Sequence, residues 1–305
     1  MEKSRKIRMM GTRIDLRVQH PRAESVLDEL VSLLHYYEKL FSANDPESGL
    51  NKINQNAGIR AVQVDSELYE LIKLGKKHSL APSSLLNIAI GPLVQSWRIG
   101  FDDAKKPTDK IIKKELRKVD LDQVQLSENE VYLSKKGMAI DLGALAKGYI
   151  ADRLIDYLKE VGATSALINL GGNLVTMGPA MKHSDGYWRI GVQNPLKRRG
   201  QSQIVLKIQD QSVVTSGIYE RQLKKEGKSY HHILNPDTGY PVETDLVSLT
   251  IISDLSVDGE IWTSRLFGQR TKEAIQKIEE IPGIEGIVIN QEGDIFLSKG
   301  VHSLL

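Results

Sequence analysis

Residues 141–152 combine an acidic residue, a run of small residues and a lysine directly before an amphipathic helix. The stretch begins Asp141-Leu-Gly-Ala144-Leu-Ala-Lys147-Gly148. Backbone N–H groups at a helix start attract negative oxygen atoms, and small residues let a ligand approach the backbone closely. The segment therefore predicts an anion site, with an ordinary solvated helix start as the alternative interpretation.

Other short segments follow the same logic. Glycine pairs or small residues at 171–172 and 216–217 predict turns that close strands, with positive φ and backbone N–H groups that face a cleft. Together with the first segment they predict a site assembled from distant parts of the chain. These segments are Asn87-Ile88-Ala89, Asn169-Leu170-Gly171-Gly172-Asn173, Thr215-Ser216-Gly217 and His231-His232-Ile233.

Two segments could supply proton transfer and metal ligands. His231 and His232 precede the turn sequence 235–239, and one of them is expected to project inward as an acid or base; a structural histidine is the alternative. Asp258 and Glu260 offer oxygen ligands of the kind magnesium prefers. A helix N-cap with solvated acids is the other interpretation of that segment.

Composition limits the remaining possibilities. The 305 residues are 40% hydrophobic, enough for one domain over 1–305 or for two intimately packed subdomains. The absence of cysteine excludes thiolate chemistry and leaves oxygen or imidazole for any metal. A net charge of +2 predicts no nucleic-acid partner, and the basic run 197–199 is interpreted as a solvated loop.

No apolar run is long enough to predict a membrane span. The charged N-terminus lacks an apolar segment behind it, so a cytoplasmic protein is expected. An exported lipoprotein whose signal has been removed is the alternative.

Hydrophobic periodicity alternates between helical and strand patterns. Helices are predicted over 22–41, 145–160 and 270–281, and Asp65 is predicted to cap another. Short polar turns such as 291–294 favour antiparallel hairpins, which indicates an α+β fold with a mixed, largely antiparallel sheet and packed helices. Strands are predicted over 7–18, 131–133, 166–170, 188–192, 204–208, 246–252, 284–289 and 295–298.

In this order and spacing, the segments closely resemble the ApbE family from residue 9 to about residue 298. They are Met10-Gly-Thr12, Phe41-Ser42, Ile53-Asn54, the run 87–97, the run 141–148, the run 169–173, Thr215-Ser-Gly217, the run 232–239 and Asp258. The resemblance implies an ApbE-like (T-fold-like) architecture. It also implies an FAD:protein FMN transferase, which uses magnesium and FAD to attach FMN to a threonine of a target protein and releases AMP.

The resemblance also implies individual roles. His232 and Asp258 would be the catalytic residues, and a magnesium ion would be held by the Ala144 carbonyl, Asp258 and Thr263. The family's FAD-contacting positions fall on Met10, Thr12, Asn87, Ile88, Ala89, Asp141, Lys147, Gly171, Gly172, Asn173, Thr215, Ser216, His232 and Ile233.

The chain departs from the family pattern at three points. Asn87 stands where an aspartate is usual, and Ala43-Asn44 lacks an aromatic residue that often follows Phe-Ser. Family members often space the metal aspartate and threonine by four residues, whereas Asp258 and Thr263 are five apart, which on a regular helix rotates them about 140° apart. Either the helix starts after Asp258, with Gly259 absorbing the extra turn, or Glu260 or water replaces the threonine.

Three functions follow from this comparison. The first is FMN transfer to an acceptor flavoprotein with a threonine-containing flavinylation motif, with general-base help from His232 or a metal-bound carboxylate. The second is a magnesium-dependent FAD pyrophosphatase with water as the acceptor. The third is a protein that binds FAD without catalysis.

Overall fold

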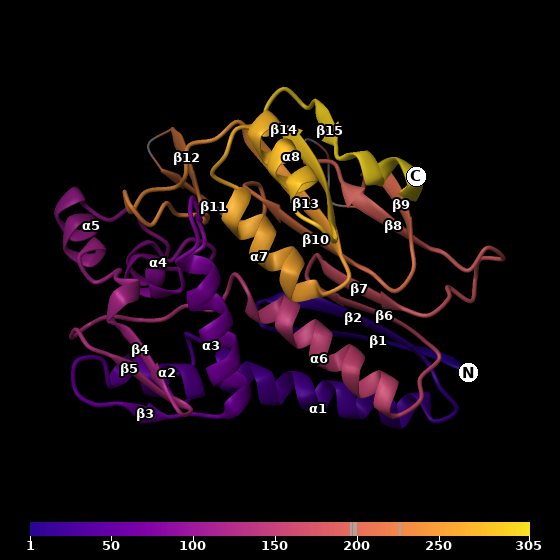
Figure 1. The fold of residues 1–305 in the computed structure, drawn as a ribbon, viewed down its shortest axis with the longest axis horizontal. Helices are drawn as coiled ribbons and strands as arrows, with labels where there is room; N and C mark the ends of the chain where they lie inside the picture. Colours follow the sequence, from indigo (N-terminus) through magenta and orange to yellow (C-terminus); the bar gives the residue numbers. More distant parts are fainter. Residues whose placement is uncertain (196, 198–199, 226) are drawn as a thin grey trace.

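A large antiparallel sheet organises the molecule (Figure 1). The computed structural model describes residues 1–195, 197, 200–225 and 227–305, so Arg198 and Arg199 of the basic run lie outside the described residues. Within the described part the sheet has eight strands in the order β1-β2-β6-β7-β10-β13-β14-β15, and each neighbouring pair is antiparallel. The predicted α+β fold with a largely antiparallel sheet is confirmed.

Smaller sheets surround it, in the orders β3-β5-β4, β8-β9 and β11-β12. The strands are β1 (Glu2–Met9), β2 (Thr12–Gln19), β3 (Val62–Gln63), β4 (Val124–Ser127), β5 (Glu130–Leu133), β6 (Ser165–Leu170), β7 (Asn173–Met177), β8 (Trp188–Gln193), β9 (Ser202–Ile208), β10 (Ser212–Gly217), β11 (Gln222–Lys225), β12 (Lys228–His231), β13 (Leu246–Ser253), β14 (Ile284–Asn290) and β15 (Ile295–Leu297).

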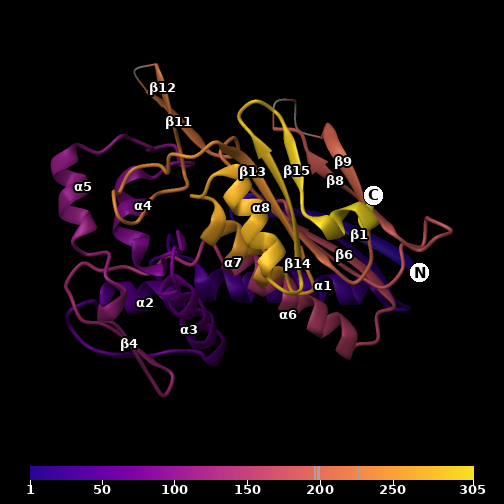
Figure 2. The same cartoon turned by 45° about the horizontal axis from the view of Figure 1, so that its top comes forward.

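Helices cover one face of the large sheet, and the β8-β9 ribbon covers part of the other (Figures 1 and 2). Side chains alternate along the strands, so Val213 of β10 packs toward the ribbon while Val214 lies against α7. The helices are α1 (Ala23–Phe41), α2 (Gly49–Gln55), α3 (Ser66–Ser79), α4 (Gly91–Trp97), α5 (Asp109–Leu116), α6 (Ala146–Glu160), α7 (Ser256–Leu266) and α8 (Thr271–Glu280), with 3₁₀ turns at Ile88–Ile90, Leu121–Gln123 and Lys299–Leu304.

The predicted helices over 22–41, 145–160 and 270–281 correspond to α1, α6 and α8. Asp65 caps α3 as expected, because its side chain accepts a hydrogen bond from the Glu67 N–H. No helix in the described part of the chain is both long and apolar enough to cross a bilayer.

Two local predictions were wrong. The predicted strand 7–18 is two strands, since Met10 and Gly11 both have positive φ and form a tight hairpin turn between β1 and β2. The predicted turn at 216–217 is the end of β10, where Gly217 pairs with Ser248. Gly217 is suited to this place by its size, because a Cβ there would lie 2.4 Å from the Tyr219 ring.

Candidate functional site

A cavity of about 690 Å³ lies beside the edge where several strands of the large sheet turn. Its walls come from the β1–β2 and β6–β7 turns, the end of β10, the start of α6, the middle of α7 and the segment after β12. The structure therefore assembles the distant segments that the sequence singled out. The predicted site residues that line this cavity are Met10, Thr12, Asn87, Asp141, Ala144, Lys147, Gly171, Asn173, Thr215, Ser216, His232, Ile233 and Thr263.

Four predicted residues are not among those that line it. Ile88 and Ala89 are buried in the core behind Asn87, with exposed fractions of 1% and 0%. Gly172 lies on the outer side of the β6–β7 turn, where a Cβ would meet nothing within 4 Å. Asp258 is half-buried on α7, and burial together with the nearby charge of Asp254 raises the pKa of its carboxyl group.

Helix α7 explains why Asp258 is absent from the cavity. The helix begins at Ser256 and runs without a break through Gly259, so the alternative in which it starts after Asp258 is wrong. Asp258 and Thr263 are therefore about 140° apart around the helix. Glu260, Thr263 and Ser264, spaced by three and four residues, share one face and line the cavity.

The centre of the cavity wall is a buried carboxylate held by two donors. Glu260 Oε1 accepts a hydrogen bond from Lys147 Nζ at 2.7 Å and from Asn173 Nδ2 at 3.1 Å. The Glu260 side chain is 6% exposed and that of Lys147 is 28% exposed. Both hydrogen bonds use Oε1, which leaves the other carboxylate oxygen without a hydrogen bond to the described chain.

The start of α6 has the features of an anion site. Its N-cap residue, Leu145, offers no side-chain hydrogen bond, so first-turn N–H groups are not capped in this way. Asp141 precedes the helix and accepts a hydrogen bond from the Gly143 N–H at 2.8 Å. Burial raises the pKa of Asp141, while the Gly143 N–H and the positive charge of Arg221 act in the opposite direction.

The β6–β7 turn is held close to the β1–β2 turn. Gly171 has φ 68°, and a Cβ there would lie 2.1 Å from Thr12 Oγ1. The residue must therefore be glycine on two grounds, backbone conformation and space. On the opposite wall, the Asn87 side chain accepts a hydrogen bond from the Ala89 N–H at 2.9 Å and caps the short 3₁₀ turn that follows.

The two adjacent histidines have different positions. His231 Nε2 contacts the Val242 carbonyl at 3.1 Å, outside the cavity lining, whereas His232 lines the cavity with Nδ1 3.4 Å from the Arg221 carbonyl. Burial, followed by the positive charge of Arg221, lowers the pKa of His232 to about 4. His232 is therefore neutral near pH 7 and able to accept a proton.

Several lining residues were not predicted from the sequence. Arg221 is exposed on the segment between β10 and β11 and faces both Asp141 and His232. Ser264 lies on the same face of α7 as Glu260, and Phe267 follows one turn later. The four-residue spacing of Glu260 and Ser264 was visible in the sequence, whereas nothing near Arg221 marks it as part of the site.

The site suits a hard cation through oxygen atoms rather than through a cluster of metal-binding side chains. Within the described residues no group of three or more histidine, aspartate or glutamate side chains could hold a metal. The cavity lining does include Glu260, Asp141, Thr263 and Ser264, and the Thr263 hydroxyl donates a hydrogen bond to the Glu260 carbonyl at 3.2 Å. Magnesium commonly takes one or two protein carboxylates and completes its shell with water and substrate phosphates, so these residues fit it.

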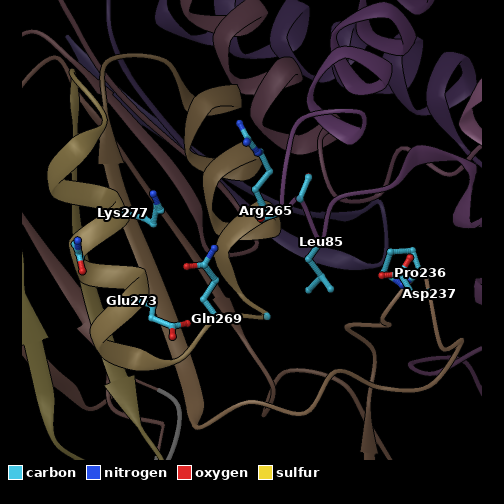
Figure 3. A pocket seen from close by; sticks show the side chains of 11 residues that line it. Leu85, Pro236, Asp237, Arg265, Gln269, Glu273 and Lys277 are labelled. Carbon is cyan, nitrogen blue, oxygen red and sulfur yellow. The ribbon is translucent and has the colours of Figure 1, made fainter.

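A second hollow of about 500 Å³ lies beside the first (Figure 3). It is lined by the end of α7, one face of α8 and residues 83–85 and 236–237, and Leu85 lines both spaces. The Arg265 guanidinium stacks on the Trp262 ring, 4.3 Å from its centroid. No ligand chemistry follows from this mixture of charged and amide side chains.

Comparison with known proteins identifies the family and the fold. Residues 10–288 match the ApbE family. The chain belongs to the ApbE family. A relative named FAD:protein FMN transferase from Klebsiella pneumoniae (strain 342) is 40% identical over 293 residues, which cover 95% of this chain and 90% of the relative. Another of the same name, from Treponema pallidum (strain Nichols), is 33% identical over 319 residues, covering 98% and 88%.

Solved ApbE structures share the architecture. The ApbE protein of Thermotoga maritima matches with a TM-score of 0.91 at 25% identity, covering 100% of this chain and 99% of that chain. The flavin transferase ApbE from Vibrio cholerae matches with a TM-score of 0.87 at 22% identity over 100% and 99%, which shows the common fold. The predicted ApbE-like architecture is therefore confirmed.

Proposed function

We propose that this protein transfers FMN from FAD to a threonine hydroxyl of an acceptor flavoprotein and releases AMP. The observation that carries the proposal is the Lys147–Glu260–Asn173 cluster, which faces a cavity at the start of α6 in an ApbE-family chain. A lysine, the positive end of a helix dipole and a buried carboxylate suit a pyrophosphate held together with a divalent cation. The names of the relatives supply the reaction class.

The residues of the chain divide the work of binding and orienting FAD. Lys147 and the first turn of α6 would hold phosphate oxygens, because both present positive potential to the cavity. Apolar lining residues such as Met10 and Ile233 offer a surface for the flavin ring. Asn87 contributes a neutral amide, so the contact there is a hydrogen bond without a charge.

We propose that Glu260, rather than Asp258, supplies the carboxylate for magnesium. Its support is position: Glu260 lines the cavity with Thr263 and Ser264, and Asp258 does not. Ala144 also lines the cavity and can offer its backbone carbonyl. Magnesium, when bound, neutralises negative charge on the pyrophosphate and on the departing AMP.

In the transfer step, the threonine oxygen forms a bond to the FMN phosphorus as the bond from that phosphorus to the AMP oxygen breaks. The hydroxyl proton passes to a base, and neutral His232 is available for it. A bound pyrophosphate would raise the pKa of His232 from its low value, because negative charge nearby stabilises the imidazolium ion. His232 is then a better base in the complex than in the free protein.

Two assays test the function. FAD and magnesium are incubated with the protein and with a flavoprotein encoded near its gene, and AMP release is measured together with FMN that stays on the acceptor after denaturation. Covalent FMN on a threonine supports transfer. AMP and free FMN without an acceptor would indicate a pyrophosphatase, and stoichiometric FAD binding without AMP release would indicate a non-catalytic protein.

A further inference from the structure

Asp152 is a buried carboxylate that lies outside the cavity but contacts the helix that carries Glu260. Asp152 is 7% exposed and lies on α6, five positions after Lys147. Oδ1 accepts a hydrogen bond from the Ser256 N–H at 2.7 Å, and Oδ2 accepts one from the Val257 N–H at 2.9 Å. These are the first two residues of α7.

Helix α7 has no cap of its own. Its N-cap residue, Leu255, makes no side-chain hydrogen bond, so the donors at the helix start need acceptors from elsewhere. Asp152 supplies both acceptors from the neighbouring helix, and its negative charge lies at the positive end of the α7 dipole.

A glycine brings the two helices close together at the same place. A Cβ at Gly148 would lie 2.6 Å from the Ser256 carbonyl oxygen and 2.8 Å from Glu260 Cγ. Gly148 and Asp152 are four residues apart and share one face of α6. The position of α7 along α6 is therefore fixed by close contact at one residue and by two hydrogen bonds at the other.

A second set of hydrogen bonds connects the start of α7 to the cavity. Ser256 Oγ donates to Asn173 Oδ1 at 2.6 Å, and Asn173 Nδ2 donates to Glu260 Oε1 at 3.1 Å. Ser256, Asn173 and Glu260 are 0%, 2% and 5% exposed, so water does not compete strongly for these contacts. A shift of Ser256 would consequently move the partner that orients Glu260.

We propose that Asp152 is a positioning residue, which sets the Glu260 carboxylate against Lys147 by holding the first turn of α7. The proposal rests on the proposed function, because the effect of displacing Glu260 is measured as a change in kcat for AMP release from FAD. Asp152 touches neither the cavity nor a substrate bound there. Its effect reaches the site through Ser256 and Asn173.

A matched control separates positioning from ordinary helix capping. Asp245 Oδ1 accepts a hydrogen bond from the Thr271 N–H, the first residue of α8, at 3.1 Å, and Asp245 is not among the cavity-lining residues. Asp152→Asn and Asp245→Asn each weaken a cap supplied from another element. Ser256→Ala removes the hydrogen bond from Ser256 Oγ to Asn173 Oδ1 and serves as an independent variant.

The experiment measures AMP release from FAD, FAD affinity by flavin fluorescence, and amide hydrogen exchange at the start of α7. We expect Asp152→Asn to lower kcat by about 10- to 100-fold, to change FAD affinity by less than about threefold and to speed exchange at Ser256 and Val257. In a Glu260→Gln background the same substitution should lower kcat by less than about threefold, because interacting residues are not additive. Asp245→Asn should leave kcat unchanged.

Two results would overturn the proposal. One is an equal loss of kcat from Asp152→Asn with and without Glu260→Gln, since independent effects add. The other is unchanged hydrogen exchange at the first turn of α7 in Asp152→Asn, which is measured whether or not the protein turns over FAD. Absence of AMP release by the unaltered protein would instead contradict the proposed function, and the exchange result would still decide whether Asp152 holds α7.

Discussion

Replacement of Glu260 by glutamine tests the assignment of the site most directly. The substitution keeps the shape of the side chain and one oxygen for Lys147 and Asn173, but it removes the negative charge. If this carboxylate organises the cation and pyrophosphate, AMP release should fall by about 10²-fold or more, as when one preorganised charge-stabilising group is lost from an active site. FAD binding without magnesium should change little.

The structure also sets the expected cost in stability. Breaking a fully buried ion pair by removing one partner costs about 3–5 kcal/mol. Lys147 is 28% exposed, however, and can regain water, while the glutamine oxygen can still accept a hydrogen bond. We therefore expect a loss of about 1.5–3 kcal/mol, the range for a hydrogen bond to a charged group, which thermal unfolding would show as a Tm decrease of several degrees.

Asp258→Asn is the matched control on the same helix. Asp258 is not among the cavity-lining residues, and burial, followed by the nearby charge of Asp254, raises the pKa of its carboxyl group. Removal of the Asp258 charge should relieve that repulsion, so activity and Tm should both stay close to those of the unaltered protein. If Asp258→Asn abolishes AMP release while Glu260→Gln retains it, the reasoning from helix geometry is refuted.

The other predictions concern pH and backbone conformation. Because the pKa of His232 is about 4 in the free protein, kcat/KM should stay level as the pH falls from about 8 to 6. Bound pyrophosphate raises the pKa of His232 in the complex, so kcat should decline at a higher pH than kcat/KM does. If kcat and kcat/KM decline at the same acidic pH, this reasoning is contradicted. Gly171→Ala should destabilise by about 1–3 kcal/mol more in denaturant unfolding than Gly162→Ala, which shares positive φ but meets nothing within 4 Å; equal losses would show that the approach to Thr12 is unimportant. Burial raises the pKa of Asp152 from 3.8 to about 6. The proton-linked part of its contribution to stability is therefore fully present below the unfolded pKa and is lost as the pH rises through about 6, on the order of 3 kcal/mol at about 1.4 kcal/mol per unit, whereas the hydrogen bonds from Ser256 and Val257 favour the ionised carboxylate. Asp152→Asn should remove that part of the pH dependence of the free energy of unfolding measured in urea. An unchanged dependence on pH would contradict the assigned pKa of Asp152.

The sequence predicted elements well where a local physical signal was strong. The apolar spacing of α1 and the aspartate cap of α3 are properties of a few neighbouring residues, and both are present in the structure. The hairpin between β1 and β2 was missed because Met10 takes positive φ, a conformation that non-glycine side chains rarely adopt. The end of β10 was mistaken for a turn because Gly217 is needed for space beside Tyr219 rather than for chain reversal.

The cavity required information that no local pattern holds. Arg221 lines the cavity because the segment between β10 and β11 places its positive charge near Asp141 and His232. The proposal of Glu260 in place of Asp258 has a basis in spacing: an unbroken helix places residues four apart on one face, and Glu260 with Ser264 keeps that spacing. The resemblance to the family pointed to Asp258, which in the continuous helix α7 lies on a different face from Thr263 and does not line the cavity. Glu260 lies on the face of α7 that lines the cavity and Asp258 does not, so the proposed role of Glu260 follows from the helix face rather than from the identity of the acid.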